Sequence, residues 1–206
     1  GSPGEAGRDY PEGIALTSPL RTAALAWRFR SANLLFATEL GEESRFIHRR
    51  RVIERALAIA PFLRFPEAPY PVVADGRVVW ILEGFTGSLA FPLSAPQAFG
   101  SIRRSVSYVR NSVKVTVDAV TGSIAFYRVP LDDPLADAVE SAYPGLLRPM
   151  SDMPQELREH LRYPRTLLDL QSGVLLQYHQ ETAAAFHGQQ DVWNEPQELA
   201  NSTTPV

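Results

Sequence analysis

The stretch from Ser105 to Val129 limits most strongly what this chain can fold into, because it is typical of two β-strands joined by a turn. Over residues 113–117, valine alternates with lysine and threonine, which places the valines on one face of a pleated strand. Thr121-Gly122 supplies a turn, and a second apolar run brings the chain back. The pattern predicts a β-hairpin with one buried face.

A second hairpin is predicted between Tyr70 and Phe85. Two β-rich runs flank Asp75-Gly76, and an Asp-Gly pair in this setting is one of the strongest short hairpin signals. The run around Trp80 is apolar on both alternations, so we expect a central or doubly covered strand there. The segment 84–100 is rich in Gly, Ser and Pro and predicts a loop.

Helices are predicted on both sides of these hairpins. Ser18-Pro19 is a typical helix start, and apolar residues recur at helical spacing over residues 19–38. A second helix is expected over residues 43–60, ending before Pro61. After Val129, short helices are expected to begin near Asp133-Pro134, Pro154 and Thr182, and a longer helix at Tyr163-Pro164.

Together these elements predict an α+β fold. Two hairpins form one antiparallel sheet of about four strands, packed by the two N-terminal helices and by a helical C-terminal half. We expect a lead and linker over residues 1–12, one domain over residues 13–187 and a loosely ordered polar tail over residues 188–206.

Composition narrows the function classes. A hydrophobic content of 45% with 10% aromatic residues is that of a globular chain. A net charge of −3 gives no reason to expect a nucleic-acid partner. The absence of cysteine excludes disulfides, thiol catalysis and cysteine-ligated zinc. No run approaches the roughly 20 apolar residues that would cross a bilayer.

The candidate contact residues are arginines of the predicted second helix, where they could meet an anionic surface such as lipid headgroups. They are Arg45, Arg49, Arg50, Arg51 and Arg55. The alternative is an ordinary solvated helix face, partly neutralised by neighbouring glutamates.

Two kinds of catalytic centre have weak support. His160, His179 and His187, with Glu181, match no metal-ligand spacing, so we expect no metal and no cofactor. A carboxylate-based hydrolase would need an acid and a base or nucleophile that face each other across a cleft. The candidates are Asp75, Glu83, Asp118, Asp132 and Asp133, and turn or helix-cap roles explain several of them.

Two blocks of the sequence resemble signature blocks of Uncharacterised Protein Family 0182. They are YVRNSVKVTVDAVTG at residues 108–122 and YPGLLRPMSDMPQELREHLRYP at residues 143–164. Weaker blocks at residues 30–45 and 60–81 agree in order. The segment 84–104 is shorter than the insertion usual at this place in the family.

The resemblance implies large bacterial integral membrane proteins, with transmembrane helices followed by an extracytoplasmic region to which this chain would belong. It implies no activity and no catalytic residue. We therefore expect a non-catalytic extracytoplasmic domain at the cell membrane, in contact with an envelope component, a membrane-protein partner or anionic lipid headgroups. The alternative is an envelope-directed hydrolase whose carboxylates converge only in the fold.

Overall fold

The computed structural model describes residues 13–16, 18–36, 44–46, 51–100, 102–188 and 193. The predicted lead over residues 1–12 lies outside the described residues. So does the predicted tail over residues 188–206, apart from residues 188 and 193. The described elements combine helices with a largely antiparallel sheet, which confirms the α+β fold.

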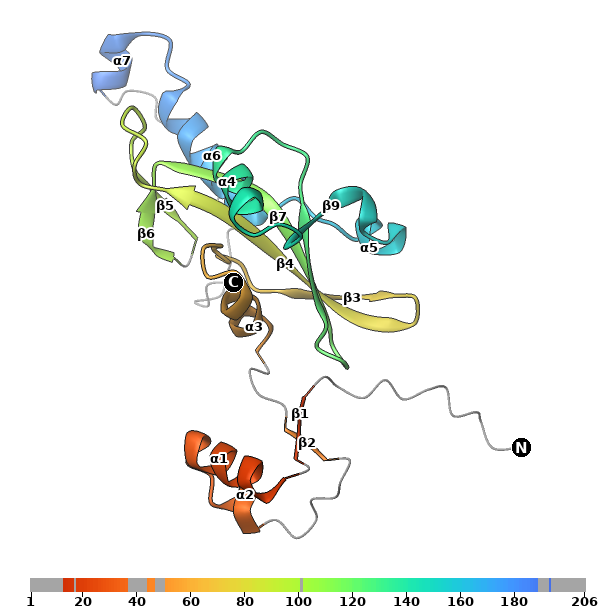
Figure 1. Cartoon of the computed structure of the whole chain (residues 1–206). Helices are drawn as coiled ribbons and strands as arrows, with labels where there is room; N and C mark the ends of the chain where they lie inside the picture. Colours follow the sequence, from red (N-terminus) through yellow and green to blue (C-terminus); the bar gives the residue numbers. More distant parts are fainter. Residues whose placement is uncertain are drawn as a thin grey trace, which may run out of the picture.

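The fold is built on a five-stranded sheet with the strand order β3-β4-β7-β8-β9 (Figure 1). Its strands are β3 (Tyr70–Ala74), β4 (Arg77–Ser88), β7 (Tyr108–Asp118), β8 (Ile124–Arg128) and β9 (Leu147–Pro149). The first four pair antiparallel, so both predicted hairpins form and join through β4 and β7. The short strand β9, which runs parallel to β8, is an addition to the predicted sheet.

The hairpin turns form as their residues indicate. Between β3 and β4, Asp75 and Gly76 have φ values of 49° and 69°, as a tight two-residue hairpin turn requires. After β7, the Asp118 carboxylate accepts a hydrogen bond of 2.7 Å from the backbone N–H of Thr121. Gly122 completes this turn with a φ of 75°.

Each edge strand of the sheet contains a proline. Pro71 lies within β3 opposite Trp80, and Pro149 ends β9 opposite Arg128. Proline has no backbone N–H, so it is tolerated at the edge of a sheet and excluded from its centre.

One face of the sheet is covered by α3 (Val52–Ile59) and α4 (Pro134–Ala142). Val113, Val115 and Val117 of β7 point to this face and are buried, as their alternation predicts. Asp133 caps α4, because its carboxylate accepts a hydrogen bond from the backbone N–H of Leu135 at 3.1 Å. The buried core residues are Ala56, Ala60, Leu63, Leu82, Val113, Val115, Val117, Phe126 and Leu147.

The opposite face carries two smaller clusters. The 3-10 helix η1 (Met150–Asp152) and α5 (Gln155–Glu159) cover one end, where Ile81 and Met153 are buried. At the other end, Phe85 and Phe99 pack edge to face with ring centroids 4.9 Å apart.

Three further elements surround that second cluster. They are the ribbon of β5 (Gln97–Phe99) and β6 (Ile102–Val106), and the helix α6 (Arg165–Tyr178). The last helix, α7 (Ala183–Gly188), extends beyond α6 at the upper left of Figure 1. None of the described helices has the length and apolar character needed to cross a bilayer.

The prediction of a loop over residues 84–100 is wrong in part. The strand β4 continues to Ser88, and β5 occupies residues 97–99. Gly84 belongs inside the strand because β7 approaches it closely: a Cβ atom there would lie 3.0 Å from the carbonyl O of Val113. Close strand packing explains this glycine better than loop chemistry does.

The N-terminal unit lies apart from the sheet (Figure 1). It consists of β1 (Ile14–Ala15), α1 (Pro19–Phe29), α2 (Asn33–Phe36) and β2 (Arg45–Phe46). The predicted helix over residues 19–38 is therefore divided into α1 and α2, and it does not pack on the sheet as expected. The second predicted helix, observed as α3, does cover the sheet.

A helix C-cap explains where α1 ends. Arg30 adopts a left-handed conformation with φ 51° and ψ 40°. The backbone N–H of Ser31 then donates to the carbonyl O of Ala26 at 3.0 Å, which satisfies the end of the helix.

The prediction of one helix over residues 43–60 is wrong at its start. Arg45 and Phe46 form β2, which pairs with β1 so that Ile14 lies opposite Phe46. This ribbon satisfies backbone groups that a helix beginning at residue 43 would have used internally. The helix α3 begins at Val52.

Candidate functional site

The arginines predicted as an anionic-surface contact are distributed over different elements. Arg45 is exposed in β2, Arg51 precedes α3 and Arg55 lies within α3, while Arg49 and Arg50 lie outside the described residues. The expectation that all five share one helix is wrong, because α3 starts only at Val52. Their contact with an anionic surface stays a prediction.

Two of these arginines have partners within the fold. The Arg51 guanidinium donates to the Glu54 carboxylate at 3.0 Å, in a pair that is largely exposed. The Arg55 guanidinium donates to the carbonyl O of Gly122 at 2.5 Å and so connects α3 with the turn between β7 and β8.

A cleft of about 420 Å³ opens between β7, the start of α6 and the segment over residues 161–164. Its apolar walls include Leu131 and Leu167. Its polar lining residues are Arg110, Asn111, Lys114, Arg162, Tyr163 and Gln171. This set contains cationic and neutral groups and no carboxylate, so the surface of the cleft favours an anionic group with an apolar body.

A buried ion pair lies beside the cleft. Glu83 of β4 and Lys114 of β7 are directly opposite in the antiparallel register, and the Lys114 ammonium donates to the Glu83 carboxylate. The two side chains are 3% and 8% exposed. Burial raises the pKa of the Glu83 carboxyl, and the ammonium of Lys114 opposes that rise.

Tyr70 and Arg162 connect the edge of the cleft to β3. The Arg162 guanidinium lies over the Tyr70 ring, 4.7 Å from its centroid. Burial, followed by the nearby negative charge of Glu83, raises the pKa of Tyr70 to about 12. Tyr70 is therefore a neutral hydrogen-bonding group at physiological pH, and the positive charge at this edge belongs to Arg162.

A second polar cluster surrounds Asp133, which is 1% exposed. Its carboxylate accepts hydrogen bonds from Ser112 and Thr86, both at 2.5 Å, and from the Tyr108 hydroxyl at 2.7 Å. Burial alone would raise the pKa of Asp133, but these hydrogen bonds outweigh it and hold the pKa below its ordinary value. With Leu135 N–H as a further donor, the carboxylate is fully engaged as a structural cap.

The carboxylates considered for hydrolysis also have structural roles. Asp75 forms the β3–β4 turn, and Asp118 pairs with Arg77 at 2.9 Å while it caps the next turn. Glu83 is paired with Lys114 and Asp133 is enclosed by donors, whereas Asp132 is exposed. The structure places no two of these five across the cleft from each other.

Three histidines, His160, His179 and His187, lie at or near helix ends. His160 follows α5 and His179 follows α6, each with its Nδ1 atom 2.7 Å from a carbonyl O of the preceding turn. His187 lies in α7. Within the described ranges, no three His, Cys, Asp or Glu side chains are grouped to hold a metal ion.

Sequence reasoning missed both polar clusters. Lys114 carried a signal, because it is the one lysine of the chain and interrupts a run of valines. Its partner could be found only from the register of β4 on β7. Thr86, Ser112 and Asp133 come from three separate segments and carry no motif.

Comparison with known proteins gives one consistent answer. Residues 8–206 match the family model described as Uncharacterised protein family (UPF0182). UPF0182 proteins of Sulfurovum sp. and Cupriavidus necator are 38% and 36% identical over 187 and 198 residues, which is 90% and 96% of this chain. A UPF0182 protein of Methanospirillum hungatei is 40% identical over 196 residues, or 95% of the chain.

These matches cover only 20%, 21% and 22% of the respective relatives, so the chain spans about a fifth of their length. No solved structure matches this chain.

Proposed function

Because this chain belongs to the uncharacterised protein family UPF0182, of whose curated members it spans about a fifth, we propose that it is a non-catalytic binding domain of a longer membrane protein. The domain lies on the extracytoplasmic side of the cell membrane and contacts an envelope component. The resemblance of its two sequence blocks to a family of integral membrane proteins supports this location.

The cleft beside Lys114 is the contact site. Glu83 compensates the charge of Lys114 from within the sheet, so Arg110 and Arg162 give the cleft its positive charge. Apolar side chains line the remaining surface. A carboxylate or phosphate on an apolar body complements both features, and this charge pattern is the observation that carries the proposal.

Binding of decanoate, measured by isothermal titration calorimetry, tests the site. We expect the 206-residue chain to bind decanoate, and the Arg110→Gln/Arg162→Gln variant to bind it about tenfold more weakly through loss of two charge-assisted contacts. The matched control is Arg51→Gln/Arg148→Gln, which makes the same change in net charge at exposed arginines outside the cleft. Equal affinity of both variants, or equally tight binding of decyltrimethylammonium, contradicts the assignment.

A topology measurement tests the location. In the full-length protein, alkaline phosphatase fused next to this domain should be active, because that enzyme works only outside the cytoplasm. Fluorescent green fluorescent protein at the same position would contradict an extracytoplasmic domain.

A further inference from the structure

The exposed face of α1 is apolar. Leu20 and Trp27 are 83% and 87% exposed and are seven residues apart, which places them on the same side of the helix two turns from each other. Ala23 and Ala24 lie between them and are exposed as well. The side of a helix that faces water normally carries polar residues, so the large exposed apolar side chains of α1 depart from that pattern.

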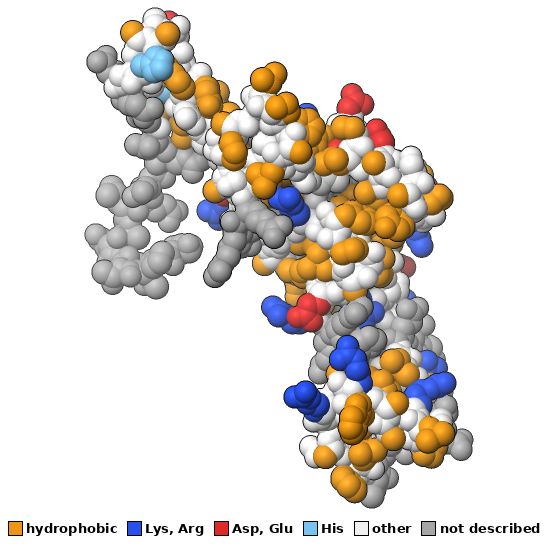
Figure 2. Space-filling model, turned by 60° about the vertical axis from the view of Figure 1, so that its left-hand side comes forward, with side chains coloured by type: hydrophobic (Ala, Val, Ile, Leu, Met, Phe, Trp, Pro, Cys, Tyr) orange, Lys and Arg blue, Asp and Glu red, His pale blue; other side chains and the backbone are white. Residues whose placement is uncertain are grey.

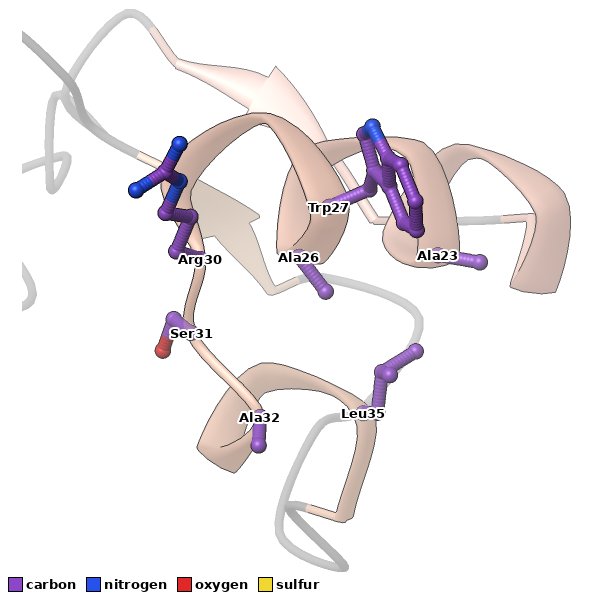
Figure 3. Close-up of a pocket in the computed structure, with 7 residues that line it drawn as sticks. All are labelled: Ala23, Ala26, Trp27, Arg30, Ser31, Ala32 and Leu35. Carbon is purple, nitrogen blue, oxygen red and sulfur yellow. The ribbon is translucent and has the colours of Figure 1, made fainter.

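The helix α2 continues this surface. Leu35 and Phe36 are 52% and 79% exposed. The two helices border a groove of about 630 Å³, and Figure 3 shows that Ala26 of α1 and Leu35 of α2 point into the space between them. Large apolar side chains gathered on one small unit mark a surface that contacts something other than water.

The described residues of this unit carry only positive charges, and its glutamates Glu39, Glu42 and Glu43 lie outside them. Its described residues contain Arg21, Arg28, Arg30 and Arg45 and neither Asp nor Glu. Arg21 and Arg28 are also seven residues apart, so they form a row next to that of Leu20 and Trp27. Figure 2 shows this pattern at the lower right, where hydrophobic side chains lie among arginines.

We propose that the N-terminal unit docks on an anionic lipid surface. The side chains of Leu20, Trp27 and Phe36 enter the headgroup region, and the arginines of α1 contact lipid phosphates. With its 11 residues, α1 is too short to cross a bilayer and lies along the surface instead. This inference stands apart from the binding cleft, which is on the sheet domain.

The charges of α1 and α2 favour a lipid surface over a second copy of the chain. Two copies facing each other through these helices would bring the arginines of α1 together, and neither helix contains a carboxylate to compensate them. Anionic headgroups provide the opposite charge, and Trp with Arg around an apolar face is the composition of a helix in the membrane interface.

Vesicle co-sedimentation of the 206-residue chain tests the proposal. We expect binding to vesicles of phosphatidylcholine mixed with phosphatidylglycerol, weaker binding to phosphatidylcholine alone, and weaker binding at high salt. The Leu20→Glu/Trp27→Glu variant should bind the mixed vesicles at least tenfold more weakly. The Arg21→Gln/Arg28→Gln variant should bind the mixed vesicles about tenfold or more weakly than the unchanged chain, and its binding to phosphatidylcholine alone should not change.

The matched control is Leu93→Glu/Leu175→Glu, because these leucines are 102% and 67% exposed elsewhere on the molecule. It should bind vesicles like the unchanged chain, and circular dichroism should show that all variants keep their fold. Wild-type vesicle binding by the Leu20→Glu/Trp27→Glu variant would overturn the proposal. So would a dimer that this variant abolishes, in a chain that binds no vesicles, since the apolar face would then pair two copies.

Discussion

The guanidinium of Arg55 donates a hydrogen bond of 2.5 Å to the carbonyl O of Gly122, across 67 positions of the sequence. This contact holds α3 against the turn between β7 and β8. A residue that the sequence suggests as a surface contact therefore has a role in packing the helix on the sheet.

Replacing Gly122 with alanine should destabilise the domain. The residue has a φ of 75°, and a Cβ atom there would clash with the Nη1 atom of Arg55. The backbone costs about 1–2 kcal/mol in this conformation, and displacement of Arg55 adds roughly 1 kcal/mol from its lost hydrogen bond. The decrease in the free energy of unfolding, measured in urea, gives the sum of the two costs.

Gly145→Ala is the matched control for that substitution. Gly145 has a φ of 83° but no atom within 4 Å of a Cβ, so the variant should carry the backbone cost alone. In an Arg55→Ala background, Gly122→Ala and Gly145→Ala should then cost the same. A persistent difference there would show that Arg55 is not the cause.

Replacing Gly173 with alanine should stabilise the domain by about 0.5–1 kcal/mol. Gly173 lies inside α6 with ordinary helical backbone, and a Cβ atom there meets nothing within 4 Å. Alanine restricts the unfolded chain more than glycine does and favours the helix. The midpoint of thermal unfolding should rise, and an unchanged midpoint would mean that α6 contributes little to the cooperative unit.

Replacing Lys114 with methionine should destabilise the domain by about 3–5 kcal/mol, because Glu83 would be left buried and unpaired. The double variant Glu83→Leu/Lys114→Met should recover most of this loss, since it removes both charges. Chemical denaturation of the single and double variants measures the coupling. The exposed pair provides the control: Arg51→Ala should cost less than about 1 kcal/mol.

Asp133 should make stability depend on pH in the acid range. Its pKa is lower in the folded protein than its ordinary value of 3.8, so the unfolded chain binds more protons as the pH falls. The stabilisation is therefore fully present above this ordinary value and is lost as the pH drops through the lower, folded value.

The Asp133→Asn variant should unfold about 2 kcal/mol more easily at neutral pH and should show a flatter acid dependence. Asp132→Asn, at the exposed neighbouring position, is its control and should leave both properties unchanged. Urea unfolding over a series of pH values measures the stability at neutral pH and its dependence on acid. If the free energy of unfolding fell with pH in parallel for the unchanged chain and Asp133→Asn, Asp133 would not be the group responsible for the acid dependence.

The sheet was predictable where its signals are local. The valines of β7, the Asp75-Gly76 turn and the Asp133 cap depend on neighbours within a few residues, and each forms as predicted. The extent of β4 was not predictable, because Gly84 has the appearance of a loop residue and its place inside the strand depends on the close approach of β7. The parallel pairing of β9 likewise requires a contact made late in the chain.

The candidate site was less predictable than the fold. The spacing of the arginines suggested one helix, but pairing of Phe46 with Ile14 turns the first part of that segment into a strand. Lys114 could be assigned to the polar side of β7, whereas its burial depends on Glu83 in β4. Sites assembled from distant segments leave no periodic pattern to detect.

The prolines in the two outer strands have a consequence for assembly. A further strand added at β3 or β9 would meet Pro71 or Pro149, each of which withholds a donor from the growing ladder. Recognition by strand addition and amyloid-like stacking are thereby disfavoured at both margins. Tight packing of many copies side by side then carries less risk of irreversible aggregation.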